Sequence, residues 1–291
     1  MPYTNLLPAT YYQEFLKGME ESEDLLFEKF YTLKVSQPHD LPDNGRLVQS
    51  PYAAFLDDAL MDIPNELNKM AINILKLNVW MDVMRDHPDQ RENILFDFIF
   101  PIAHITLMSP YTIKQRFFFW TAHLSHQANL TKGSGDWVDD FNNLPADKHI
   151  KEEHANRASK DWLGWKPLIK CLNRIDASDY KKQTGDYRNS YTHRYSPAIE
   201  IGCNRFYTRH HPQDLSHTPE MKDWASGRIG PVYGLGGSKS LPVGNIVDSC
   251  SKQLNIARKS YRLFRVLAEE QLQYLLPNRK DGMRIELSEE S

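Results

Sequence analysis

The sequence predicts a mainly α protein built as a helical bundle. Apolar residues recur at helical spacing over several long segments, and the alternation typical of half-buried strands is scarce. Stretches rich in Pro and Gly separate these segments from one another. The chain has 291 residues, which is enough for a large helical domain with a well-buried core.

The N-terminal part, residues 1–60, is expected to form a helical extension. Apolar side chains lie at helical spacing over residues 8–34, and residues 35–51 contain several prolines and form a loop. A strong helix with an apolar stripe is expected at about 66–86. This helix opens the main domain, which we expect to span residues 61–276.

The most apolar run of the chain covers residues 94–108. Because this run contains Asp97 and His104, we expect a buried core element in it rather than a membrane span. A kink is expected at Pro101, and Ser109-Pro110 is expected to end the helix. Further helices are expected at 112–130, at about 147–162 and at 166–176.

The C-terminal third combines an insert with a long helix. Residues 196–242 are rich in Pro and Gly and are expected to be irregular, with a short hairpin around Ile199–Tyr207 as an alternative. A long amphipathic helix is expected at about 243–276, and Pro277 stops it. Residues 277–291 are expected to form a charged tail.

Charge and cysteine content favour a cytoplasmic protein. The formal net charge is −3, so a nucleic acid would have to bind a local basic patch. The three cysteines, Cys171, Cys203 and Cys250, are widely spaced, which fits a reducing compartment and offers no zinc-binding CxxC pair. The N-terminus carries neither the basic region nor the apolar region of a secretory signal.

Residues 187–195, Tyr-Arg-Asn-Ser-Tyr-Thr-His-Arg-Tyr, are the most informative stretch of the chain. RNA cleavage without a metal needs a base for the 2′-hydroxyl, an acid for the 5′-oxygen and a cation for the phosphoryl oxygens. His193 suits proton transfer, because the ordinary pKa of histidine is about 6.5. Arg188 suits the phosphate, because its fork binds two oxygens and keeps its charge. Asn189 can orient the histidine or a phosphate oxygen.

The spacing of these three residues limits how they can act together. On a helix, Asn189 and His193 share a face because they are four residues apart. Arg188 lies about 140° away from His193 around the helix axis. Either the long arginine side chain wraps back, or the helix begins or ends within the segment. One copy also offers only one histidine, so a two-fold dimer is expected to supply both a base and an acid.

The segment resembles the signature of HEPN domains, which are helical RNases of prokaryotic toxin and phage-defence systems. Their pattern is Arg, then a polar residue, then His after four to six intervening residues. Here it stands as Arg188, Asn189 and His193. In toxins that are paired with nucleotidyltransferase antitoxins the pattern extends to His-x-Tyr, and this chain continues to Tyr195.

This resemblance implies a helical bundle, a homodimer with the two motifs facing each other, and metal-independent cleavage of RNA without a cofactor. Arg188, Asn189 and His193 would then be catalytic. The tyrosine that matches Tyr195 is the residue to which the antitoxin attaches AMP in the toxin subgroup. The long insert 196–242 and the N-terminal region depart from the minimal toxins.

Several residues around the motif are expected to bind RNA. Arg205–Arg209 interleaves cations with aromatic side chains, a composition that suits stacking on single-stranded bases and contact with phosphates. Arg228 adds to the local positive charge, and the basic face of the last helix is interpreted as solvated, with a basic groove beside the motif as the alternative. The residues that we expect to contact RNA are Tyr191, Arg194, Arg205 and Arg209.

Three alternatives remain open at this point. His210, His211 and His217, with Asp214, are candidate metal ligands, although loop histidines are expected instead. Residues 234–240, Gly-Leu-Gly-Gly-Ser-Lys-Ser, superficially resemble a phosphate-binding loop and are interpreted as a flexible loop whose lysine could touch RNA. The rival to an RNase is a non-catalytic helical protein that binds RNA or dimerises as a scaffold.

Overall fold

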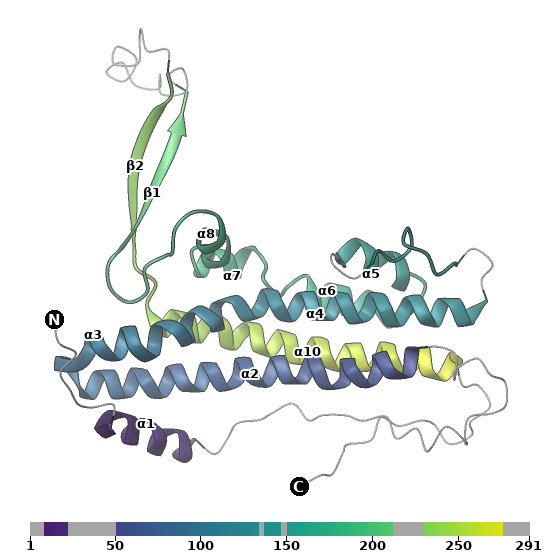
Figure 1. Ribbon diagram of the computed structural model, residues 1–291, viewed down its shortest axis with the longest axis horizontal. Coiled ribbons are helices and arrows are strands. Elements are labelled where there is room, and N and C mark those ends of the chain that lie inside the picture. The colour runs from purple at the N-terminus through teal and green to yellow at the C-terminus, as the bar shows by residue number, and fades with distance from the viewer. Residues whose placement is uncertain (1–8, 23–50, 134–136, 147–149, 212–229, 276–291) are drawn as a thin grey trace.

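The computed structural model describes residues 9–22, 51–133, 137–146, 150–211 and 230–275. Three long helices form its body, namely α2 (Tyr52–Asp86), α4 (Phe100–Lys132) and α10 (Val243–Leu275). Each of them packs against the other two, and they run side by side along the long axis of the molecule (Figure 1). The prediction of a mainly α protein is confirmed.

Aromatic side chains fill part of the core between the helices. Trp80 of α2 is almost fully buried between Phe15 of α1 (Ala9–Glu21) and Phe98, with ring centres 4.5 and 4.2 Å away. Burying a large apolar side chain stabilises a fold by about 1.5–3 kcal/mol. This stack therefore anchors α1 to the bundle. The rest of the expected extension, residues 1–8 and 23–50, lies outside the described residues.

Pro64 lies inside α2, where it removes one backbone hydrogen bond. The carbonyl that loses its amide partner is that of Leu60, four residues earlier, and the buried hydroxyl of Tyr261 on α10 donates to it at 3.4 Å. The helix therefore continues through the proline. The expected start at about residue 66 is wrong, because α2 begins at Tyr52 and crosses the boundary that was expected between residues 60 and 61.

Pro110 interrupts the hydrogen bonding of α4 in the same way, and the carbonyl left without an amide partner is that of Thr106. The thiol of Cys250 on α10 donates to this carbonyl at 3.6 Å. The break expected at Ser109-Pro110 is therefore wrong: α4 is one helix that runs through both residues.

The segment before α4 changes helix type three times. A 3₁₀ turn, η2 (Pro88–Gln90), leads to α3 (Arg91–Ile94) and then to the π-helical turn η3 (Leu95–Ile99). Pro101 follows as the second residue of α4, in a helical segment that continues directly from η3. The irregularity expected at Pro101 thus takes the form of a π-helical turn just before the proline.

One long helical segment, Pro88–Lys132, is apolar enough to cross a membrane by length and composition alone. A core helix of a soluble protein passes the same test, so one such segment is weak evidence. Here α4 packs against α2, α5 and α10. Of the most apolar window in this segment, 39% is buried, so the run is only partly the buried core element that was expected.

Four short helices lie along one side of the bundle (Figure 1). They are α5 (Glu152–Ser159), α6 (Trp165–Leu172), α7 (Ser178–Gln183) and α8 (Tyr187–His193). The carboxylate of Glu270 on α10 accepts hydrogen bonds from the backbone N–H groups of Leu163 and Gly164, at 2.8 and 2.7 Å. Negative charge is favourable at a helix N-terminus, so Glu270 fixes the start of α6 on α10.

The insert is not irregular in its described part. It forms an antiparallel hairpin of β1 (Cys203–His210) and β2 (Val232–Lys239), which projects from the bundle (Figure 1). A Cβ at Gly236 would clash with the ring of Phe206, which lies across it on the partner strand. Gly234 and Gly236 therefore leave room for Thr208 and Phe206 on the partner strand, and the interpretation of residues 234–240 as a flexible loop is wrong. Residues 212–229 lie outside the described residues, as does the tail 277–291.

Candidate functional site

The motif occupies the short helix α8. Gly185 and Asp186 precede it with left-handed φ angles of 62° and 50°, so the chain turns sharply out of α7. The helix ends at His193, and Arg194 has already left the helical region. The expectation that a helix begins or ends within residues 187–195 is confirmed.

One face of α4 forms the base on which α7 and α8 lie. His104, Leu107 and Tyr111 share this face because they are three and four residues apart. The Tyr187 hydroxyl lies 3.2 Å from Nδ1 of His104, and the Tyr180 hydroxyl donates to the carbonyl of Leu107 at 2.9 Å. The aromatic residue that precedes Arg188 is thus a buried anchor.

Arg188 packs against α4. Its guanidinium carbon lies 3.9 Å from the centre of the Tyr111 ring, a cation–π contact. Its Nε is buried and has no hydrogen-bond partner among the described residues. Arg188 is therefore held from one side by an aromatic ring.

A nearly buried carboxylate lies near this arginine. Burial raises the pKa of Asp176, and the positive charges of Lys181, Arg188 and Lys114 oppose that change. The Asp176 side chain is only 8% exposed, and its Oδ2 lies 4.0 Å from Nζ of Lys181. Its backbone N–H donates to the Gln253 side chain of α10 at 2.9 Å. Asp176 is thus a nearly buried carboxylate whose charge interacts with Arg188 of α8.

Asn189 and His193 lie on an exposed face of α8. The Asn189 side chain donates to Asp186 Oδ2 at 3.1 Å, so it is oriented by the preceding turn rather than by the histidine. His193 forms no hydrogen bond or ion pair with another described residue. Within one protomer no such interaction joins Arg188, which lies against α4, to His193, which faces solvent.

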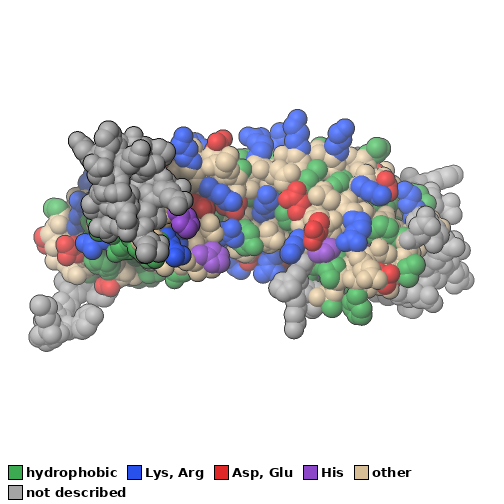
Figure 2. Space-filling model, turned by 90° about the horizontal axis from the view of Figure 1, so that it is seen from above, with side chains coloured by type: hydrophobic (Ala, Val, Ile, Leu, Met, Phe, Trp, Pro, Cys, Tyr) green, Lys and Arg blue, Asp and Glu red, His purple; other side chains and the backbone are tan. Residues whose placement is uncertain are grey.

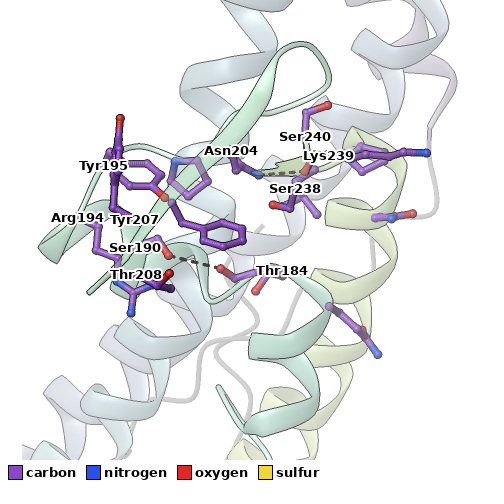
Figure 3. Close-up of a pocket in the computed structure, with 17 residues that line it drawn as sticks. Thr184, Ser190, Arg194, Tyr195, Asn204, Tyr207, Thr208, Ser238, Lys239 and Ser240 are labelled. Atoms are coloured by element: carbon purple, nitrogen blue, oxygen red, sulfur yellow. Dashed lines mark hydrogen bonds between the residues drawn. The ribbon is translucent and has the colours of Figure 1, made fainter. Parts of the chain in front are cut away.

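A pocket of about 840 Å³ lies beside the end of α8. Its walls are the α7–α8 turn, the end of α8 with the following linker, the foot of the hairpin and the start of α10 (Figure 3). None of the described residues that line it is acidic. The cations and aromatic rings in its wall are Arg194, Lys239, Tyr195, Phe206 and Tyr207.

The residues expected to bind RNA are distributed over two places. Arg194 lines the pocket, as does Tyr195. Tyr191 is 46% exposed and packs on His104, with ring centres 4.2 Å apart. Arg205 and Arg209 are exposed on β1, whereas Arg228 lies outside the described residues. Figure 2 shows Lys and Arg side chains spread over the face with the short helices, with Asp and Glu among them.

The candidate metal ligands are not brought together in the described part of the chain. There, no group of three or more His, Cys, Asp or Glu side chains could hold a metal ion. His210 ends β1 and His211 follows it, whereas Asp214 and His217 lie outside the described residues.

The comparisons with known proteins add no relative. The sequence matches no protein-family model and no curated protein, and the fold matches no solved structure.

Sequence reasoning missed Tyr111 and Asp176, because both are distant from the motif in the chain. The spacing of His104, Leu107 and Tyr111 within an apolar helix was the one available signal for this base.

Proposed function

We propose that this protein is a metal-independent endoribonuclease that acts as a homodimer in the cytoplasm. The single observation that carries the proposal is the position of His193. Its side chain is exposed at the end of α8, and the two residues that follow it, Arg194 and Tyr195, line a pocket whose described lining carries no carboxylate. The described lining of the pocket therefore does not repel the negative charge of an RNA backbone.

The proposed chemistry is attack of the ribose 2′-hydroxyl on the adjacent phosphorus. One His193 accepts the 2′-hydroxyl proton as the 2′-oxygen–phosphorus bond forms. The bond from phosphorus to the 5′-oxygen breaks, and a protonated His193 of the second copy donates a proton to that oxygen. The products are a 2′,3′-cyclic phosphate and a free 5′-hydroxyl. Arg188 stabilises the charge on the phosphoryl oxygens, and Asn189 positions the reacting groups.

The test is to incubate the purified protein with single-stranded RNA in EDTA, beside His193→Ala and Arg188→Ala. Cleavage by the wild type, lowered at least about 100-fold in His193→Ala, supports the proposal. Lys170→Ala is the matched control, because this exposed lysine lies on α6 away from α8. Equal cleavage by wild type and His193→Ala, or none by the wild type at any concentration, rejects the proposal.

A non-catalytic RNA-binding or scaffold protein is the second candidate. The observation that favours it is that two motif side chains already have structural partners, Arg188 on Tyr111 and Asn189 on Asp186. RNA binding or dimerisation without cleavage, in the same preparation, selects this candidate. Light scattering after size-exclusion chromatography measures whether the protein is a dimer.

The proposed setting is a toxin or an antiviral defence system, with a nucleotidyltransferase antitoxin as partner. It rests on the match of Tyr195 to the residue that receives AMP in the toxin subgroup. Tyr195 is half-buried and lines the pocket. If a nucleotidyltransferase is found to be encoded beside this protein, incubation with that enzyme and ATP is expected to add AMP to the wild type but not to Tyr195→Phe. Mass spectrometry reads the adduct, and equal labelling of both proteins contradicts this role of Tyr195.

A further inference from the structure

The pocket at the foot of the hairpin contains side chains for which the proposed cleavage step has no use. We propose that it is a nucleotide-binding pocket. The base lies against Tyr195 and Tyr207, and its phosphate is bound by Arg194. Lys239, on the opposite side, binds a second phosphate where the ligand has one. This inference does not depend on RNA cleavage.

Charge is the first argument. Two cations, Arg194 and Lys239, line the pocket, and none of its described lining residues is acidic. Neither cation forms an ion pair with a carboxylate of the described residues. An unpaired arginine in a recess lined by polar groups is suited to a phosphate, because its planar fork can donate two hydrogen bonds to it.

The aromatic side chains are the second argument. Figure 3 shows Arg194, Tyr195 and Tyr207 on one side of the pocket and Ser238, Lys239 and Ser240 on the other. A phosphate-binding side chain therefore lies beside two rings that can stack on a flat base. Tyr207 is 62% exposed, so its ring is free of the core. Two phosphate positions on opposite sides suit a ligand longer than one nucleotide.

The pocket wall is also fixed by hydrogen bonds. Asn204 accepts from the backbone N–H of Ala198 and donates to the carbonyl of Lys239 at 3.0 Å, which holds the linker against the hairpin. Leu241, two residues before α10, donates its backbone N–H to the carbonyl of Ala198 at 2.9 Å. The volume of about 840 Å³ lies within the range of about 300–1,000 Å³ that is typical of small-molecule sites.

The outward face of the hairpin also carries cationic and aromatic side chains. The strand register places Arg205, Tyr207 and Arg209 on one face with Tyr233 and Lys239 of the partner strand. Tyr207 and Lys239 lie on this face and are also among the residues that line the pocket, whereas Asn204, Phe206 and Thr208, which line it too, lie on the opposite face of β1. A strand of nucleic acid that enters the pocket can follow the hairpin, with cations and rings in alternation along β1.

Isothermal titration calorimetry of the full chain tests the pocket with four probes: 5′-AMP, adenosine, inorganic phosphate and the dinucleotide pApA. AMP is expected to bind at least about tenfold more tightly than adenosine or phosphate, because base and phosphate are held together. pApA is expected to bind more tightly than AMP. Equal affinity for AMP and phosphate would overturn the proposal, since the rings would then contribute nothing. No binding of either nucleotide would overturn it as well.

Variants locate the binding. Arg194→Ala is expected to weaken AMP and pApA alike, by about tenfold or more. Lys239→Ala is expected to weaken pApA and to leave AMP nearly unchanged. The matched control is Lys170→Ala, which removes one exposed charge from α6 and should change neither affinity. AMP binding that is unchanged in Arg194→Ala would overturn the assignment even if the protein binds nucleotides elsewhere.

Competition with a short single-stranded RNA, in His193→Ala so that no cleavage intervenes, identifies the source of the nucleotide. RNA that displaces AMP assigns the pocket to a strand. AMP binding without displacement by RNA assigns it to a free nucleotide, and both outcomes support the pocket itself. None of these measurements needs RNA cleavage, so failure of the proposed RNase activity leaves them interpretable.

Discussion

The guanidinium carbon of Arg188 lies 3.9 Å from the centre of the Tyr111 ring, so the first residue of the motif is positioned by α4. A cation–π contact contributes about 0.5–1 kcal/mol at an exposed site and about 2 kcal/mol when desolvated. The Nε of Arg188 is buried, which places this contact between the two cases.

We predict a coupling free energy of about 0.5–2 kcal/mol between Arg188 and Tyr111. The measurement is a double-mutant cycle of urea unfolding with Arg188→Ala, Tyr111→Leu and the combined variant. Tyr111→Phe is the matched control, because it keeps the ring face and should keep the coupling. Additive effects of the two single substitutions would show that the contact does not stabilise the fold.

The second prediction concerns Tyr261, whose hydroxyl donates to the carbonyl that Pro64 leaves without its amide partner. Tyr261→Phe removes that donor and leaves a buried carbonyl unsatisfied, so the free energy of unfolding should fall by about 1–3 kcal/mol. Chemical denaturation followed by circular dichroism measures the change.

Tyr274→Phe is the control for that substitution. Tyr274 is 46% exposed, and its ring, which lies 5.2 Å from the Lys132 ammonium, is retained in phenylalanine. Its effect should stay within about 0.5 kcal/mol. Equal effects of the two substitutions would contradict the role given to the Tyr261 hydroxyl.

The long helices could be predicted from apolar spacing, but not their continuity through proline. Pro110 was expected to end a helix, because proline removes a hydrogen bond, and Pro64 lies before the helix that was expected at about 66–86. The donors that replace those bonds, Tyr261 and Cys250, come from α10. No local pattern in α2 or α4 carries that information, since it depends on which side chains pack against each proline.

For the candidate site as well, features with a local sequence signal could be predicted, and contacts between distant segments could not. The motif itself could be found from the sequence because its pattern is local, and the structure places it on the short helix α8. The contact of Arg188 with Tyr111 arises from packing between distant segments and has no local signal. The strand β2 was hidden because Gly234 and Gly236 are typical of loops, whereas here they leave room for Thr208 and Phe206 on β1.

The third prediction concerns thiol reactivity. Cys203 is exposed on β1, whereas Cys171 and Cys250 are buried. We expect Ellman's reagent at pH 8 to modify one thiol per chain rapidly in the native protein and three in denaturant. Cys203→Ser should abolish the fast native reaction. Rapid modification of a second thiol in the native wild type would contradict the burial of the other two.

The last prediction is a loss of stability in alkali that depends on Cys250. Burial raises the pKa of this thiol from 9.0 to about 12, and a hydrogen bond with Tyr180 partly offsets the rise. The folded state therefore favours the protonated thiol. Its contribution is fully present below the unfolded pKa near 9, and it is lost as the pH rises toward about 12.

Across that window the free energy of unfolding should fall by about 1.4 kcal/mol per pH unit through Cys250 alone. Burial also raises the pKa of Tyr187 to about 12, so part of the decline should remain in Cys250→Ala. Urea unfolding in steps from pH 8 to pH 11 measures the slope. A lower stability of the variant at pH 8 does not affect the test, because only the slopes are compared. Identical slopes in the two proteins would mean that the buried thiol does not couple folding to pH.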